Sequence, residues 1–242
     1  MTRAGQGTGV QVVIVPVEAL ARRVAAVIAA RLSDAVRERG RATLAVSGGG
    51  TPLPMFDELA QQDLPWAQVH VLQVDERSAP DGDDARNAEG LREHLLDVVP
   101  AATAHLVPVG RLDPDAAAEA YAATLADVAG TPAVLDVVQL GLGADGHTAS
   151  LFPGDAVLEV STRDVAATSG PHQGRRRVTL TYPALARARM RVWMVAGEEK
   201  ADAVARVVAR DPAVPAGRVA APSLLVVDEA AAGALPPATP RA

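Results

Sequence analysis

The chain has 242 residues, of which 49% are hydrophobic and 21% charged, and this composition is that of a globular protein rather than a disordered one. It contains no cysteine, which excludes a disulfide scaffold, a cysteine-ligated metal site and a thiol nucleophile. The net charge of −6 argues against nucleic acid or an anionic membrane as a partner, and the longest stretch without Asp, Glu, Lys or Arg, Ala42–Phe56, is too short to cross a bilayer.

Short apolar stretches alternate along the chain with segments of helical periodicity. Strands are predicted at Val10–Val15, Ala42–Val46, Val69–Val74, Val134–Leu140, Val178–Leu180, Arg191–Ala196 and Ser223–Val227. Helices are predicted between them at Glu18–Arg39, Met55–Gln61, Ala85–Val98, Asp115–Val128 and Glu198–Arg210. Apolar strands separated by helices indicate the α/β class, with a mainly parallel sheet that is covered by helices on both faces.

No linker divides this pattern, so we expect a single domain over residues 10–234, between disordered tails at 1–9 and 235–242. Residues 154–177 are the least periodic stretch and are expected to form either a long loop or a small excursion from the sheet. The N-terminal sequence has no apolar run of the secretory kind, which predicts a cytoplasmic location.

Ligands of open α/β sheets bind beyond the carboxyl ends of the strands. One such end carries Ser47-Gly48-Gly49-Gly50-Thr51-Pro52. The glycines permit a sharp turn and a close approach to a ligand, and we expect Thr51 to cap the next helix with Pro52 in its first position. The N–H groups of such a loop suit a phosphate. The alternative is a tight turn without a ligand.

Asp75-Glu76-Arg77 directly follows another predicted strand, and Asn87 comes ten residues after the arginine. One interpretation is a solvated loop in which Asp and Arg pair locally. The other is that its neighbours hold Arg77 so that the guanidinium grips an anionic oxygen through two hydrogen bonds.

The segment Gly141–Pro153 has the GxGxxG spacing of dinucleotide-binding loops. Its final proline ends any helix within two turns, and the segment lies past the midpoint of the chain, so a nicotinamide cofactor is rejected. What remains is Asp145 two residues before His147 on a glycine-rich turn. Histidine is the natural proton-transfer residue near neutral pH, whereas a purely structural histidine is the alternative.

Gly197-Glu198-Glu199-Lys200 lies at the end of the predicted strand Arg191–Ala196. The glutamates favour a helix N-terminus, but Lys200 opposes the helix dipole there, and a nearby anion would explain its presence. The basic run Arg175–Arg177, taken alone, is typical of a solvated face.

In this order and spacing, the four segments resemble the 6-phosphogluconolactonase family, from about Val12 to Ala231. The most specific part is Asp-Gly-His-Thr-Ala-Ser-Leu-Phe-Pro at 145–153, because the related glucosamine-6-phosphate deaminases share Asp-Gly-His but continue with an Asn-Glu-Pro type of sequence. The glycine loop, Asp-Glu-Arg, Gly-Glu-Glu-Lys and Arg-Val-Thr-Leu-Thr-Tyr-Pro at 177–183 also match. The segment 78–85 lacks the usual Val-Pro-Pro start, and Ala88 stands where an aromatic residue is usual after Asn87.

The resemblance implies a Rossmann-like α/β sandwich that hydrolyses 6-phospho-D-glucono-1,5-lactone to 6-phosphogluconate in the oxidative pentose phosphate pathway, with no cofactor and no metal. The expected catalytic residues are His147 as general base, Asp145 as its partner, and Arg77 or the Gly143–Gly146 turn as donor to the oxyanion. The expected substrate- and phosphate-binding residues are Ser47, Gly48, Gly49, Gly50, Thr51, Asp75, Asn87, Gly143, Gly146, Arg177 and Lys200. The expected partner is the sugar-phosphate lactone, bound to a monomer or small homo-oligomer, with no nucleic acid and no membrane.

Two other functions stay open. A sugar-phosphate deaminase or isomerase of the same fold would need a general base placed to take a proton from C2, and the continuation Ser150-Leu151-Phe152 argues against it. A non-catalytic sugar-phosphate sensor would carry a basic helix-turn-helix segment at one end, and the strand predicted from Val10 leaves no room for one before it.

Overall fold

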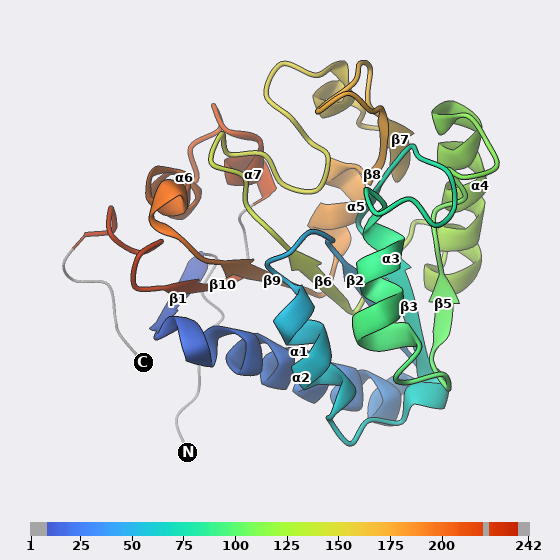
Figure 1. Ribbon diagram of the computed structural model, residues 1–242, viewed down its shortest axis with the longest axis horizontal. Coiled ribbons are helices and arrows are strands. Elements are labelled where there is room, and N and C mark those ends of the chain that lie inside the picture. The colour runs from blue at the N-terminus through green and yellow to red at the C-terminus, as the bar shows by residue number, and fades with distance from the viewer. Residues whose placement is uncertain (1–8, 220–222, 237–242) are drawn as a thin grey trace.

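A seven-stranded sheet forms the centre of the computed structural model, which describes residues 9–219 and 223–236 (Figure 1). The strand order is β1-β10-β9-β6-β2-β3-β5, and every neighbouring pair is parallel. The bounds are β1 Val10–Val15, β2 Ala42–Val46, β3 Val69–Gln73, β5 Thr103–His105, β6 Val137–Leu140, β9 Met190–Val195 and β10 Ser223–Asp228. The predicted α/β class with a mainly parallel sheet is confirmed.

Helices cover both faces of this sheet, as predicted. They are α1 Val17–Arg39, α2 Leu53–Ala60, α3 Asn87–Leu91, α4 Pro114–Ala129, α5 Tyr182–Arg187, α6 Ala201–Val208 and α7 Pro215–Val219. The helices α1 and α2 pack on one face, and α4 to α7 belong to the hydrophobic core of the other. The long helix α1 buries an apolar stripe and ends at Gly40, whose φ of 74° is the left-handed conformation expected after a helix.

The direction in which strands are added to the sheet reverses between β2 and β6. From β2 the chain adds β3 and β5 on one side, whereas β6, β9 and β10 follow one another on the other side. Such a switch point leaves a crevice at the carboxyl ends of the two central strands. The glycine loop follows β2 and the segment with His147 follows β6, so the topology brings both to this crevice.

A second, antiparallel sheet of three strands lies beside the first. It contains β4 Asp75–Arg77, β7 Val165–Ala167 and β8 Arg177–Leu180 in the order β4-β8-β7. Of the two interpretations of Asp75–Arg77, the solvated loop is therefore wrong, because the three residues form a strand. The chain changes sheets at Val74, whose N–H donates to the carbonyl of Val46 and whose carbonyl accepts from Leu180. Residues 154–177 form an excursion that supplies β7 to this sheet.

Other differences from the predicted elements have local causes. The helix expected over 85–98 begins at Asn87, where the Glu76 carboxylate accepts from the first N–H groups, and it widens into a π-helical turn at Arg92–Leu96. A 3₁₀ turn at Glu198–Lys200 precedes α6, and the strand expected from Val134 begins at Val137. The short elements β5, α5 and α7 were not predicted.

The two tails lie outside the described residues except for residues 9, 235 and 236. Within the described part of the chain, no helix is long and apolar enough to span a membrane.

Candidate functional site

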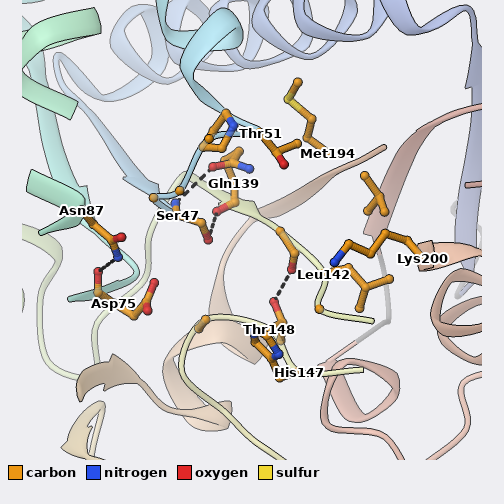
Figure 2. A pocket seen from close by; sticks show the side chains of 18 of the residues that line it. Ser47, Thr51, Asp75, Asn87, Gln139, Leu142, His147, Thr148, Met194 and Lys200 are labelled. Atoms are coloured by element: carbon orange, nitrogen blue, oxygen red, sulfur yellow. Dashed lines mark hydrogen bonds between the residues drawn. The ribbon is translucent and has the colours of Figure 1, made fainter. Parts of the chain in front are cut away.

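A cavity of about 190 Å³ opens at the switch point of the large sheet. Figure 2 shows the side chains that line it, with Thr51 and His147 on opposite sides. Of the predicted site residues, all line this cavity except Asp145 and Gly146, which line a neighbouring hollow. The lining comprises Ser47, Gly48, Gly49, Gly50, Thr51, Pro52, Asp75, Arg77, Asn87, Gln139, Gly141, Leu142, Gly143, His147, Thr148, Ala149, Arg177, Met194, Val195, Ala196 and Lys200.

The glycine loop forms one wall and presents backbone donors. Gln139 on β6 holds its start, because its side-chain carbonyl accepts from the N–H of Ser47 at 3.1 Å and its main-chain carbonyl accepts from the Ser47 hydroxyl at 3.3 Å. The N–H groups of residues 48–51 donate to no described residue. A row of unpaired N–H groups at a helix start is a favourable place for an anion.

The predicted helix cap at Thr51 was wrong. The helix α2 begins at Leu53, Pro52 is the residue that precedes it, and no side chain caps this end. Thr51 instead is an exposed residue at the mouth of the cavity. The first N–H groups of the helix are consequently not satisfied by a threonine hydroxyl.

His147 and Asp145 form a close pair on the turn after β6. The imidazole Nδ1 and the carboxylate Oδ1 are 2.5 Å apart, and the same oxygen accepts from the backbone N–H of His147 at 3.1 Å. Burial opposes ionisation of Asp145, but these hydrogen bonds outweigh it and lower the pKa of that carboxyl. An ionised Asp145 holds the proton on Nδ1 and leaves the lone pair of Nε2 available for proton transfer.

The two glycine N–H groups of the same turn, which the sequence offered as an alternative to Arg77 for the oxyanion, are engaged within the turn. The N–H of Gly143 donates to the carbonyl of His147 at 2.8 Å, and the N–H of Gly146 donates to the carbonyl of Gly143 at 2.9 Å. Gly143 serves a different purpose, because a β-carbon there would lie 2.1 Å from Nδ1 of His147. The glycine lets the imidazole pack against the backbone.

The strand β4 sends alternate side chains to opposite faces, which separates the roles of its three charged residues. Asp75 and Arg77 line the cavity, whereas Glu76 is fully buried on the other side. There its carboxylate accepts from the N–H groups of Asn87 and Ala88 and pairs with Arg86 at 3.1 Å. Glu76 therefore anchors the start of α3.

Arg77 and Arg177 are direct partners across the β4–β8 ladder, so both guanidinium groups lie on the cavity side. The Nε atom of each is buried without a hydrogen-bond partner among the described residues. Burial lowers the pKa of Arg177; Asp75 opposes this effect and Arg77 adds to it. Like charges opposite each other in a ladder destabilise it, and an anion between them would remove that cost.

Asp75 and Asn87 bring oxygen acceptors to the same wall. Burial raises the pKa of Asp75. The Ser150 hydroxyl, which donates to the carboxylate at 2.6 Å, has a smaller effect that lowers this pKa. The Asn87 amide donates to the carbonyl of Asp75 at 3.0 Å, and its own oxygen is buried without a partner in the described structure. An unpaired buried acceptor that lines a cavity fits a hydroxyl group of a ligand.

Lys200 reaches the cavity from the 3₁₀ turn after β9. Its ammonium lies 4.0 Å from the Glu199 carboxylate, and its side chain is 25% exposed. Gly197, with a φ of 101°, makes the turn, and the Asp228 carboxylate accepts from its N–H. The position of Lys200 at a helix start is thus explained by its orientation toward the cavity (Figure 2).

Several lining residues were not identified from the sequence, among them Gln139, Leu142, Thr148 and Met194. Gln139 stands inside a predicted strand, where a single glutamine among apolar residues was the available signal. The others are ordinary apolar or hydroxyl residues, and only their position at the ends of β6 and β9 places them here.

The fold and this cavity define an α/β protein that takes a small anionic, hydroxyl-bearing molecule at its switch point, beside a histidine suited to proton transfer. Comparison with known families agrees with this class. The chain belongs to the family described as glucosamine-6-phosphate isomerases/6-phosphogluconolactonase, which matches residues 16–227. The predicted family resemblance is confirmed.

Individual relatives extend over most of the chain. It is 38% identical over 203 residues to a 6-phosphogluconolactonase of Synechocystis, covering 81% of this chain and 84% of the relative. It is 40% identical over 222 residues to a 6-phosphogluconolactonase of Mycobacterium tuberculosis, covering 85% and 90%. The crystal structure of a 6-phosphogluconolactonase from Shewanella baltica matches with a TM-score of 0.80 at 32% identity, covering 92% of this chain and 97% of that one.

Proposed function

We propose that the protein hydrolyses 6-phospho-D-glucono-1,5-lactone to 6-phosphogluconate, as a 6-phosphogluconolactonase of the oxidative pentose phosphate pathway. The observation that carries the proposal is one cavity in which His147, two arginines and a row of free N–H groups meet. The relatives that share most of the chain's length and bear that name support it.

The reaction begins with a water molecule held by His147. Nδ1 is engaged by Asp145, so Nε2 takes the proton from water and the hydroxide adds to C1 of the lactone. The C1 oxygen becomes an oxyanion. The bond between C1 and the ring oxygen then breaks, and the proton on Nε2 passes to that ring oxygen. The carboxylic acid formed at C1 loses its own proton to solvent.

The arginine pair is the proposed stabiliser of the oxyanion. Arg177 lies over the Phe152 ring at 5.4 Å, and the same ring contacts His147, so the pair is on the histidine side of the cavity. We assign Arg77 as the donor to the developing charge, because its Nε is unpartnered among the described residues, whereas the N–H groups of Gly143 and Gly146 are engaged within their turn.

The phosphate projects from the lactone ring on C6 and needs a separate group of donors. The glycine loop, which lies across the cavity from His147, presents free N–H groups suited to it (Figure 2). We therefore place the 6-phosphate on the N–H groups of residues 48–51, with Lys200 supplying charge. Asp75 and Asn87 would accept hydrogen bonds from sugar hydroxyls.

Direct attack by water fits the hydrogen bonding of the two serines near the cavity. The Ser47 hydroxyl donates to the carbonyl of Gln139, and the fully buried Ser150 hydroxyl donates to Asp75. Neither is paired with a histidine in the way an acyl-enzyme nucleophile requires.

The family description also includes isomerases of glucosamine 6-phosphate, so that activity is the second candidate. The deciding experiment supplies the purified protein with the phospholactone and, separately, with glucosamine 6-phosphate. Lactone hydrolysis well above the spontaneous rate is the expected result. Release of ammonia from glucosamine 6-phosphate without lactone hydrolysis would overturn the proposal.

The net charge of −6 supports an absence of nucleic-acid and membrane partners. We propose that the protein acts in the cytoplasm as a monomer or small homo-oligomer, with no cofactor and no metal. Size-exclusion chromatography with light scattering tests the oligomeric state.

A further inference from the structure

A second histidine, His172, packs on the same phenylalanine ring as His147. The Phe152 ring lies between His147, with ring centroids 4.4 Å apart, and His172, with centroids 3.8 Å apart. The planes of Phe152 and His172 differ by 14°, so these two rings are stacked. The Arg177 guanidinium also contacts the Phe152 ring, at 5.4 Å. The buried phenylalanine thus touches both the proposed base and a cavity-lining arginine.

His172 is held in place by Asp155, a residue outside the cavity. Its Nε2 lies 2.8 Å from the carboxylate, which also accepts from the N–H groups of Val157 and Ser169 and from the Ser169 hydroxyl. Burial alone would raise the pKa of Asp155, but these hydrogen bonds lower it to about 2. The imidazole is therefore fixed by a charged carboxylate that is itself held at three points.

The backbone of His172 makes a second connection to the cavity. His172 and Arg175 close a tight turn whose central residues, Gln173 and Gly174, have φ values of 54° and 78°. A non-glycine residue in the left-handed region is uncommon and costs energy. In this turn the carbonyl of His172 and the side chain of Gln173 both accept from Nη2 of Arg177, at 3.3 and 3.1 Å.

We propose that His172 is a positioning residue for the reaction: anchored on Asp155, its ring holds Phe152 against His147 while its turn holds Arg177. The inference rests on the proposed lactonase function. A side chain smaller than imidazole would leave space behind Phe152, and a loosened ring would let His147 leave the orientation needed for attack. Arg177 would lose part of its support at the same time.

The test compares three variants with the wild-type protein. His172→Ala removes the ring, His172→Phe keeps an aromatic face but cannot bind Asp155, and His94→Ala is the control. His94 pairs with Asp57 at the same 2.8 Å distance and has 26% of its side chain exposed, against 25% for His172, but it lies on the π-helical turn and does not line the cavity. Each protein is assayed for kcat and KM, and the His147 imidazole is titrated by NMR without substrate.

We expect His172→Ala to lower kcat by about 2- to 10-fold, the range that one aromatic pair represents, and to move the titration midpoint of His147. His172→Phe should lose less kcat than His172→Ala and move the midpoint less, because the stack is kept although the anchor on Asp155 is lost. His94→Ala should leave both readouts unchanged. If His172→Ala does not fold, His172→Leu replaces it, since leucine fills space without an aromatic face.

A His172→Ala protein with wild-type kcat and an unmoved His147 midpoint would overturn the proposal. Equal impairment of His172→Ala and His172→Phe would also overturn it, because the ring contact would then not be what matters. If the wild-type protein hydrolyses no lactone, the proposed function fails, but the NMR titration of His147 still decides whether His172 controls that imidazole.

Discussion

Gly48 lies against Asn87 so closely that a β-carbon on the glycine would be 2.3 Å from the asparagine side-chain oxygen. Here the loop after β2 meets the start of α3, and the two segments form one continuous wall of the cavity. The close approach explains Gly48, whereas Gly49 is required by its φ of 91°. Gly48 is therefore needed because there is no space for a β-carbon, and Gly49 because of its backbone conformation.

Gly48→Ala is expected to lower kcat/KM for the phospholactone by about 10- to 100-fold, because either the loop or Asn87 must move to admit the methyl group. Steady-state kinetics at several substrate concentrations measure the loss. Gly9→Ala is the matched control, since a β-carbon there meets no atom within 4 Å. Wild-type kinetics for Gly48→Ala would show that the wall adapts without affecting the substrate.

His147→Ala is expected to lower kcat by about 10²- to 10⁴-fold, the usual contribution of a positioned general base. Affinity for 6-phosphogluconate and the unfolding midpoint should change little, because the side chain is partly exposed at the cavity. Rates must be corrected for spontaneous hydrolysis of the lactone. A folded variant that binds 6-phosphogluconate and retains more than about a third of wild-type kcat would remove His147 from the role of base.

Lys200→Ala is expected to raise KM for the phospholactone by about 10- to 150-fold, the value of one charge-assisted contact. KM for unphosphorylated gluconolactone should change far less, because Lys200 is placed at the phosphate. Arg77→Ala provides the contrast: we expect it to reduce kcat on both substrates, as a donor to the oxyanion. An equal rise in KM for both substrates in Lys200→Ala would show that Lys200 does not bind the phosphate.

Acid is expected to destabilise the protein through His70 and His105, which lie 3.0 Å apart between Nδ1 and Nε2. Burial lowers the pKa of both, the charge of Arg41 adds to the effect on His70, and that of His70 adds to the effect on His105. The unfolded chain therefore binds more protons than the folded one below the ordinary value of 6.5. The contribution of this pair to the free energy of unfolding is fully present above that pH. It is lost as the pH falls through the lowered pKa values of the folded state.

Urea unfolding between about pH 7.5 and 5 measures this dependence. The double variant His70→Gln/His105→Gln should show a flatter dependence of unfolding free energy on pH than the wild type. Identical slopes for the double variant and the wild type would contradict the assignment to this pair.

Removal of divalent ions is expected to leave lactone hydrolysis unchanged. The cavity presents guanidinium, ammonium and N–H donors to the anionic substrate, and these supply the positive charge that a metal would otherwise bring. Activity is measured before and after overnight dialysis against EDTA, with the dialysis buffer alone as control. A loss that a divalent ion restores would replace direct His147 catalysis by a metal-assisted route.

The sequence alone determined the α/β class and most of the cavity residues. Apolar strands that alternate with helices predict a parallel sheet. This pattern can be recognised from the local periodicity of each segment, without knowing which distant residues are in contact. Ligands of such sheets bind at the carboxyl ends of strands, so position in the chain was enough to select the glycine loop, His147 and Lys200. Each of these lies on the segment that follows a strand of the large sheet.

Only the tertiary structure decided how the rest of the cavity is assembled. The strand β4 has three residues, too few for a periodic signal, and it pairs with β8 a hundred residues later, which sets Arg177 opposite Arg77. The hydrogen bonds that occupy the N–H groups of Gly143 and Gly146, and the stack of His172 on Phe152, likewise depend on contacts that no local pattern encodes. Local periodicity reports burial along one segment, whereas pairing between distant segments is settled by packing.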